Sequence, residues 1–198
     1  MLSQENQSAQ SDQTPYPVGG FTFVLHGASG DLAKRKIIPA LAHLALSGYF
    51  APESRVVFVQ RENQTADEAL AGVDEFLLRA GDEAARKSLP ALKPYLSTCQ
   101  LTLGEPQAAQ ALRDGVAGGP EPVVHYAALP SSRFIDLINC IPTVRDPAKL
   151  RLVLEKPLGF NAKESALIEE AVAAKLDESQ VYRIDHYLGK QAVQNLLA

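Results

Sequence analysis

Short apolar runs alternate along this chain with longer segments in which hydrophobic residues recur at helical spacing. The short runs are rich in β-branched and aromatic residues, which is typical of buried strands. They lie at Phe21–His26, Arg55–Gln60, Leu101–Leu103, Pro122–Ala127, Arg151–Leu154 and Val181–Ile184. The helical segments lie at Asp31–Ser47, Ala66–Ala80, Ser131–Ile141 and Ala162–Leu176. Pro39 is expected to kink or divide the first helix, because proline removes a hydrogen-bond donor.

Strands that alternate with helices predict βαβ units and a parallel sheet covered on both faces. The expected fold is therefore α/β: a doubly wound, mostly parallel sheet of the Rossmann-like, dinucleotide-binding kind. We expect this domain to span residues 21–184. Residues 1–20 contain four glutamines and no apolar stretch, and are expected to form a disordered tail. The pattern is weakest over residues 81–119, where three prolines leave the element boundaries undefined.

Composition narrows the class of protein. With 46% hydrophobic residues the chain is too apolar to be disordered, and 19 basic against 23 acidic residues give a net charge of −4. That balance argues against attraction to nucleic acid or to an anionic membrane, and no signal-peptide pattern is present. Cys99 and Cys140 match no metal-ligand spacing and are expected to be buried free thiols. We therefore expect a cytoplasmic protein with no metal, nucleic-acid or membrane partner.

A glycine turn follows the first predicted strand. Residues 27–33 read Gly-Ala-Ser-Gly-Asp-Leu-Ala, a G-x-x-G-x-x-A variant of the dinucleotide fingerprint. Gly27 permits the sharp turn, Gly30 lets the backbone approach a pyrophosphate, and small Ala33 lets the helix pack on the strand. Such a turn also occurs without a ligand, but its place between strand and helix favours a dinucleotide. The predicted cofactor-binding residues here are Gly27, Ala28, Ser29, Gly30, Asp31 and Leu32.

The end of the second predicted strand bears on the choice between NAD and NADP. An acidic residue there binds the ribose 2′-hydroxyl, whereas an arginine accommodates a 2′-phosphate. Arg61 lies at this position and favours NADP. The alternative is a solvated arginine at a strand end, and the neighbouring Glu62 leaves some use of NAD open.

A cluster of polar residues follows the last predicted strand. A helix is expected to begin near Asp185, and His186 and Lys190 would then share one face, placed to clamp a phosphate between them. Lys156 follows another strand, and in an open α/β sheet such strand ends converge on one crevice. On spacing alone the simpler interpretation is a solvated helix face with Asp185 as its N-cap.

Three segments together resemble glucose-6-phosphate dehydrogenase. They are GASGDLAKRK at residues 27–36, EKPLG at 155–159 and RIDHYLGK at 183–190, and the resemblance covers residues 21–198. It implies NADP at the glycine turn, with Arg61 at the 2′-phosphate. It also implies oxidation of the C1 hydroxyl of glucose 6-phosphate to 6-phosphogluconolactone, the dehydrogenase step of the pentose phosphate pathway.

The resemblance also implies roles for the polar cluster. His186, Tyr187 and Lys190 would hold the sugar phosphate, and Lys156 would lie between the sugar and the nicotinamide, contacting both. Asp185 matches the aspartate that pairs with the family's general-base histidine. The catalytic residues expected in this chain are therefore Asp185 and Lys156.

That histidine itself has no match in the chain. His26, His43 and His125 fall in predicted strands and a helix and are expected to be packed or satisfied there. We expect residues 185–198 to begin an active-site helix whose apolar stripe lacks a partner, with the rest of a second domain absent or supplied by a partner subunit. Little turnover is expected from the chain alone.

Two other interpretations stay open. One is a non-catalytic NADP-binding module that docks on a partner through its last helix. The other is a sugar oxidoreductase of the glucose–fructose oxidoreductase type, which also carries Glu-Lys-Pro after a strand. The segment at residues 183–190 favours glucose-6-phosphate dehydrogenase over the second.

Overall fold

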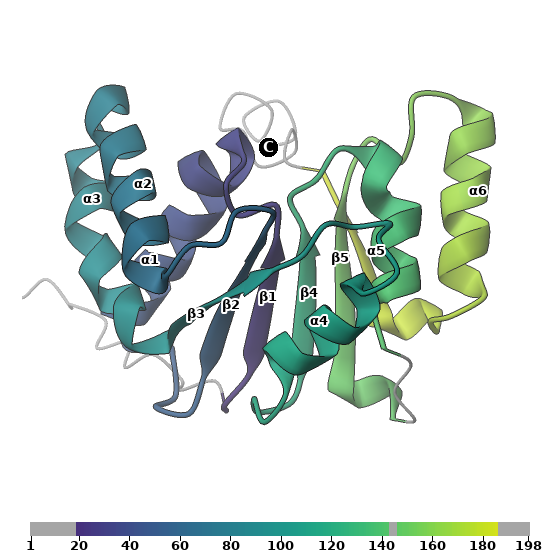
Figure 1. The fold of residues 1–198 in the computed structure, drawn as a ribbon, viewed down its shortest axis with the longest axis horizontal. Coiled ribbons are helices and arrows are strands. Elements are labelled where there is room, and N and C mark those ends of the chain that lie inside the picture. The colour runs from purple at the N-terminus through teal and green to yellow at the C-terminus, as the bar shows by residue number, and fades with distance from the viewer. Residues whose placement is uncertain (1–18, 143–145, 186–198) are drawn as a thin grey trace, which may run out of the picture.

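A single parallel sheet organises the part of the chain that the computed structural model describes, residues 19–142 and 146–185. Within that part six strands pair in the order β3-β2-β1-β4-β5-β6, and every pair is parallel (Figure 1). The strands are β1 (Thr22–His26), β2 (Arg55–Gln60), β3 (Leu96–Gln100), β4 (Val123–Ala127), β5 (Leu150–Glu155) and β6 (Val181–Ile184). The predicted doubly wound α/β architecture is confirmed.

Helices cover both faces of the sheet. One face carries η1 (Ala33–Ile37), α1 (Ile38–Leu46), α2 (Ala66–Ala80), α3 (Glu83–Ser88) and η2 (Leu89–Tyr95). The other carries α4 (Ala108–Val116), α5 (Phe134–Cys140) and α6 (Ala162–Ala173). Short turns η3 (Ser131–Arg133), η4 (Pro147–Lys149) and η5 (Glu178–Gln180) complete the set. In Figure 1 α1, α2 and α3 lie to the left of the strands and α5 and α6 to the right, with α4 in front of the sheet.

The strand order reverses between β1 and β4. The chain runs from β1 outward through β2 to β3, then returns to the other side of β1 and continues outward from β4 to β6. The loops that follow β1 and β4 therefore turn away in opposite directions and leave a crevice between them. In open α/β sheets this switch point is where ligands bind.

Two core layers hold the sheet between the helices. Alternate residues of β1 face opposite sides, so Val24 packs with α4, α5 and α6 while Leu25 packs with α1 and α2. Both side chains are fully buried. Cys99 and Cys140 are buried free thiols, as predicted.

The helix after β1 begins irregularly, as Pro39 led us to expect. Residues 31 and 32 are α-helical, residues 33–37 form a π-helical turn, and α1 continues from Ile38 with Pro39 directly after it. Pro39 has no N–H to donate, so the regular hydrogen-bond ladder is interrupted at this point of the helix.

The third strand lies elsewhere than expected. The apolar pattern predicts it at Leu101–Leu103, but β3 spans Leu96–Gln100 and the predicted residues follow it as a loop. β3 is an edge strand in which only Cys99 is buried, and its polar residues give no apolar run that would predict a strand. Leu101 and Leu103 are apolar because they pack beside the core beyond the end of the strand. Helices α3 and α4, in the same region, were not predicted.

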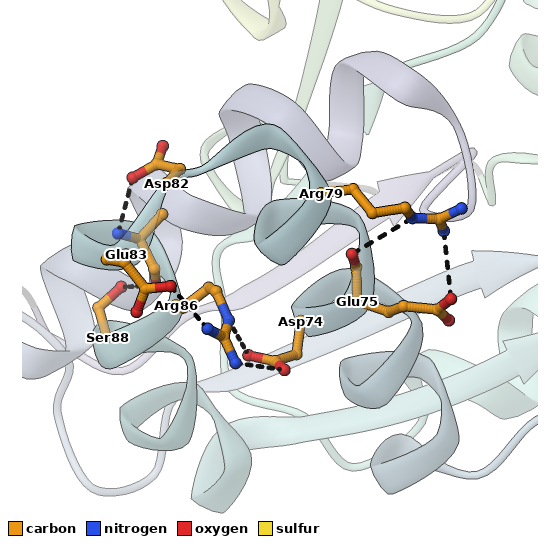
Figure 2. Close-up of polar contacts among 8 residues, drawn as sticks. Asp74, Glu75, Arg79, Asp82, Glu83, Arg86 and Ser88 are labelled. Atoms are coloured by element: carbon orange, nitrogen blue, oxygen red, sulfur yellow. Dashed lines mark hydrogen bonds and ion pairs between the residues drawn. The ribbon is translucent and has the colours of Figure 1, made fainter.

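The pair α2 and α3 shows how local chemistry sets element boundaries. Thr65 and Glu68 form a capping box at the start of α2, and Gly81 ends it in the left-handed conformation. Arg86 of α3 then reaches back to Asp74 of α2, with 2.9 Å from Nε to Oδ1 (Figure 2). This ion pair holds α2 in place, and α2 in turn forms one wall of the crevice described next.

Two predicted segments are covered only in part. Residues 1–18 of the expected tail and residues 186–198 of the expected last helix lie outside the described part of the chain. Asp185 itself is described and follows β6 directly. No helix among the described residues is both long and apolar enough to span a membrane.

Candidate functional site

A crevice opens at the carboxyl ends of β1, β2, β3 and β4, where the strand order reverses. Each strand contributes the residues that directly follow it. The glycine turn comes from β1, Arg61 from β2, Leu101 and Leu103 from β3, and Leu129 from β4. The predicted glycine turn and the predicted selector Arg61 are therefore brought to one place.

The glycine turn is shaped by a very close approach to β4. Gly27 has φ +80°, and a Cβ added there would lie 2.5 Å from the carbonyl oxygen of Ala128 and 2.9 Å from Leu129 Cδ2. The N–H of Gly27 donates to Val59 O at 3.0 Å, which ties the turn to β2 as well. Only glycine fits here, because both its left-handed conformation and its lack of a side chain are used.

The rest of the turn leads into the helix. The N–H of Gly30 donates to Gly27 O at 2.9 Å, so this group is used inside the turn, and Ala33 is fully buried against the sheet. Ser29 and Gly30 line the crevice. The N–H groups that begin a helix lack partners within it and point toward such a crevice, which suits an anion.

Asp31 places a negative charge close to this turn, and Arg35 forms an ion pair with it. Its carboxylate accepts hydrogen bonds from Arg35 Nη2 at 3.0 Å and Nε at 3.2 Å. The same guanidinium lies over the Phe76 ring, 5.5 Å from its centroid. The hydrogen bonds from Arg35 lower the pKa of Asp31. Of the three basic residues at 34–36, Arg35 is thus committed to Asp31.

The crevice is divided into two adjoining cavities that share Ser29, Gln60 and Arg61. The larger, of about 590 Å³, has apolar walls that include Val59, Leu101 and Leu129. The smaller, of about 410 Å³, is polar and lies beside α2. Sequence reasoning missed Lys34, which lines the smaller cavity together with Arg61 and Glu62. Its position one helical turn after Gly30 was the only available signal.

Side-chain hydrogen bonds fix the loop that carries Arg61. Gln100 at the end of β3 donates to Arg61 O at 3.1 Å, and Thr98 donates to Gln64 O at 2.7 Å. Gln60 donates to the Gln64 side chain at 3.0 Å. The backbone at Arg61 is therefore held from β3, while its side chain stays exposed beside both cavities.

Lys156 and Asp185 are brought together at the ends of β5 and β6. Glu155 is in register with Ile184, and the N–H of Lys156 donates to Ile184 O at 2.9 Å. Lys156 and Asp185 directly follow these paired residues, so both lie at the same strand ends. Lys156 is exposed and Asp185 is partly buried. The other predicted substrate residues, His186, Tyr187 and Lys190, lie outside the described part of the chain.

Arg183, two residues before Asp185, forms ion pairs with two glutamates. Its guanidinium pairs with Glu169 of α6 at 2.6 Å and with Glu178 of η5 at 2.7 Å. The hydrogen bonds from Arg183 lower the pKa of Glu169. This double ion pair anchors β6 two residues before Asp185, and the sequence pattern did not reveal it.

A buried pair involves Glu155, the residue directly before Lys156. The Tyr126 hydroxyl of β4 donates a hydrogen bond to Glu155 Oε1, and both residues are buried. Burial and this hydrogen bond raise the pKa of Tyr126. The pair joins β4 to the end of β5 and so helps to set where Lys156 leaves the sheet.

Two histidines are packed together below the glycine turn. His26 and His125 are fully buried, with 3.0 Å between His26 Nε2 and His125 Nδ1. Both were expected to be packed or satisfied, and both are packed, but His26 Nδ1 and His125 Nε2 have no hydrogen-bond partner. Burial lowers the pKa of His125 to about 3 and, together with His125, lowers that of His26. The pair is therefore neutral. His43 differs from the expectation, since it is exposed on α1.

These features define a class: a doubly wound domain with a glycine turn and a divided crevice at the switch point, where such folds bind dinucleotides. The chain belongs to the family described as glucose-6-phosphate dehydrogenase, NAD binding domain, whose family model matches residues 24–195. The family resemblance seen in the sequence is confirmed, and binding of a nicotinamide dinucleotide is the property that this family domain carries.

Curated relatives carry the same name. The chain is 36% identical over 179 residues to the glucose-6-phosphate 1-dehydrogenase of Dickeya dadantii, covering 88% of this chain and 36% of that protein. It is 33% identical over 178 residues to the Helicobacter pylori enzyme, covering 89% of this chain and 41% of that one. The chain thus spans about two fifths of the length of these relatives.

Solved structures agree in fold. A glucose-6-phosphate dehydrogenase in complex with its substrate glucose-6-phosphate superposes with a TM-score of 0.69 at 28% identity, covering 90% of this chain and 39% of that one. The glucose-6-phosphate 1-dehydrogenase of Mycobacterium avium gives a TM-score of 0.74 at 24% identity, covering 90% and 38%, and supports the fold alone.

The close approach at Gly27 predicts a position-specific cost. Gly27→Ala should lower the free energy of unfolding by about 1–3 kcal/mol more than Gly48→Ala, because the new methyl group overpacks against Ala128. Gly48 is the matched control, since it has φ +77° but nothing within 4 Å of an added Cβ. Urea unfolding of both variants measures the difference, and equal losses would contradict the packing argument.

The buried histidine pair predicts a pH dependence. Well above pH 6.5, the ordinary pKa of histidine, both imidazoles are neutral in the folded and the unfolded chain, so they add no pH dependence there. At lower pH the two histidines become protonated in the unfolded chain but stay neutral in the folded chain, because folding lowers their pKa values. The free energy of unfolding should therefore fall with falling pH, by up to about 1.4 kcal/mol per pH unit for each histidine.

The double variant His26→Leu/His125→Leu isolates this effect. Its free energy of unfolding should fall less steeply than that of the wild type between about pH 6.5 and 5, where the carboxylates remain ionised. Chemical unfolding at a series of pH values gives both slopes. Identical slopes would show that the histidines do not titrate as their burial requires.

Proposed function

We propose that this chain is the NADP-binding coenzyme domain of an enzyme that oxidises glucose 6-phosphate to 6-phosphogluconolactone. The observation that carries the proposal is the divided crevice, in which the glycine turn after β1 and the cations Lys34 and Arg61 line one continuous surface. The family match supports the dinucleotide, and the two cations support NADP in particular.

The residues present fit such a dinucleotide. Gly27, Ala28, Ser29, Gly30, Asp31 and Leu32 form the turn that would receive the pyrophosphate. Because Gly27 has no side chain, the turn packs directly against Ala128, where a side chain would collide. The close packing of the turn leaves its backbone accessible to a ligand. The polar cavity beside α2 offers Ser29, Lys34 and Arg61 to a 2′-phosphate. Glu62 lines the same cavity and would oppose that charge, so the preference rests on two cations against one anion.

When bound, the nicotinamide ring accepts a hydride from the substrate. The chain's own residues would bind and orient the reactants around it. We assign Lys156 to the region between sugar and nicotinamide, because it leaves the sheet at the end of β5, two strands from the glycine turn. Asp185, held beside Lys156 by the pairing of β5 with β6, is assigned to orient a histidine base. His186, Tyr187 and Lys190 are proposed ligands of the sugar phosphate.

The substrate assignment rests on the family. A related enzyme of known structure is described as a complex with its substrate glucose-6-phosphate. Further parts of the substrate pocket are proposed to come from a second domain or a partner subunit, since the relatives are more than twice as long as the matched segment. A cytoplasmic location is likewise proposed, and one relative, from Arabidopsis thaliana, is named as cytoplasmic.

A non-catalytic NADP-binding role is the second candidate, and the histidines favour it for the chain by itself. His26 and His125 are fully buried and bonded to each other, and His43 lies on the outer side of α1, far along the helix from the glycine turn. His186 is assigned to the sugar phosphate. No histidine among the described residues is therefore placed to take the proton from the sugar hydroxyl.

Arg61 should set the preference between cofactors. Arg61→Ala is expected to weaken NADP⁺ binding by about 10- to 100-fold, because a charged hydrogen bond to the 2′-phosphate is lost. NAD⁺, which lacks that phosphate, should bind nearly as before. Isothermal titration with both cofactors measures the two affinities. Lys34→Ala should give a smaller loss of the same kind.

Arg79→Ala is the matched control for this experiment. Arg79 is an exposed arginine of α2 that pairs with Glu75, outside both cavities (Figure 2). Its removal changes the net charge equally and should leave both affinities unchanged. An unaltered preference for NADP⁺ in Arg61→Ala would defeat the assignment of Arg61.

Turnover by the chain alone should be very low. A general base contributes typically about 10²–10⁴-fold to such a reaction, so we expect NADPH formation at least about 100-fold slower than by the full-length Dickeya dadantii relative assayed alongside. The assay follows NADPH absorbance with glucose 6-phosphate and NADP⁺ present. Turnover at the rate of the relative would contradict this expectation and exclude the non-catalytic role.

A further inference from the structure

Arg133 follows β4 and forms part of the wall of the larger cavity. It ends η3, directly before α5, and lines that cavity together with Leu101, Leu103 and Leu129. Its side chain is 41% exposed, so it is neither free in solvent nor part of the core. Neither the glycine motif nor the strand-end rule singled it out.

The guanidinium of Arg133 is held at two points. Nη2 donates a hydrogen bond to Leu103 O, and Nη1 pairs with Asp136 Oδ2 at 3.0 Å. Gly104, with φ +87°, makes the turn that brings the Leu103 carbonyl to the arginine. Two contacts on separate nitrogens fix the plane of the group as well as its position. Arg133 is therefore preorganised as a flat, charged surface against an apolar cavity.

The neighbouring cations indicate what this surface receives. Arg61 and Lys34 line the polar cavity, and Arg133 does not. The pyrophosphate is assigned to the glycine turn, and the nicotinamide to the side of the crevice nearer β5. The glycine turn and Arg61 line the larger cavity too, so of an NADP molecule placed in this way the adenosine is left for its remaining, apolar part beside Leu101, Leu103 and Arg133. A planar base has the shape and the π electrons that a fixed guanidinium binds well.

We propose that Arg133 forms one wall of the adenine pocket and stacks on the face of the base. This inference rests on the proposed function, because it takes NADP as the ligand of the crevice. It adds a base-binding residue that contacts the half of the cofactor remote from the chemistry. The opposing interpretation is that Arg133 acts only as a charge that attracts phosphate.

The experiment separates stacking from charge. Isothermal titration would measure binding of 2′,5′-ADP and of inorganic pyrophosphate to the wild type, Arg133→Ala and Arg133→Lys. Arg133→Ala should weaken 2′,5′-ADP binding about tenfold and leave pyrophosphate binding unchanged. Arg133→Lys keeps the charge and can still donate to Leu103 O, but it loses the planar face. It should therefore lose nearly as much affinity for 2′,5′-ADP as Arg133→Ala.

Controls exclude a purely structural effect. Urea unfolding of Arg133→Lys should match that of the wild type, which shows that the loop at Leu103 is still held. Arg79→Ala should bind both ligands as the wild type does, since Arg79 lies on α2 outside the crevice.

The outcomes that overturn the proposal are distinct. If Arg133→Ala binds 2′,5′-ADP as tightly as the wild type, Arg133 does not contact the base. If Arg133→Lys retains wild-type affinity, or if pyrophosphate binding falls with Arg133→Ala, the residue acts by charge on a phosphate. If the wild type binds neither 2′,5′-ADP nor NADP⁺, the proposed function fails first and the assignment of Arg133 fails with it.

Discussion

The approach of the glycine turn to the end of β4 is the constraint on which the crevice depends. A Cβ at Gly27 would lie 2.5 Å from Ala128 O, so the backbone of the turn passes the neighbouring strand with no room for a side chain. That approach brings the start of the first helix to the switch point between β1 and β4. Because the turn packs this closely against β4, space is left for the two cavities, which meet at Ser29 and Arg61.

Around that turn the crevice has a polar side and a more apolar side, with Arg61 on the border between them. Lys34 and Arg61 line a polar cavity beside α2, and leucines after β3 and β4 line a larger apolar one. Asp31, which would oppose an anion, is paired with Arg35. A nicotinamide dinucleotide has a matching division into phosphates and bases, so the geometry agrees with the class of ligand that the family domain binds.

Much of the fold could be predicted because its signals are local. β2, β6 and α2 begin and end where the pattern of apolar residues and caps placed them. β3 could not be found in that way, since an edge strand buries few side chains and its apolar neighbours Leu101 and Leu103 lie beyond its end. The expected clamp residues His186, Tyr187 and Lys190 stay predictions.

By itself the sequence determined the class of fold, the glycine turn, the position of Arg61 and the family, because each depends on residues close together in the chain. Tertiary structure decided the rest. Lys34 and Arg61 share the smaller cavity, Arg133 contacts Leu103 at the wall of the larger one, and Lys156 lies beside Asp185, only because parallel strands bring distant segments to one edge. Such neighbours leave no periodic mark in the sequence, since the contacts that place them are made between separate elements.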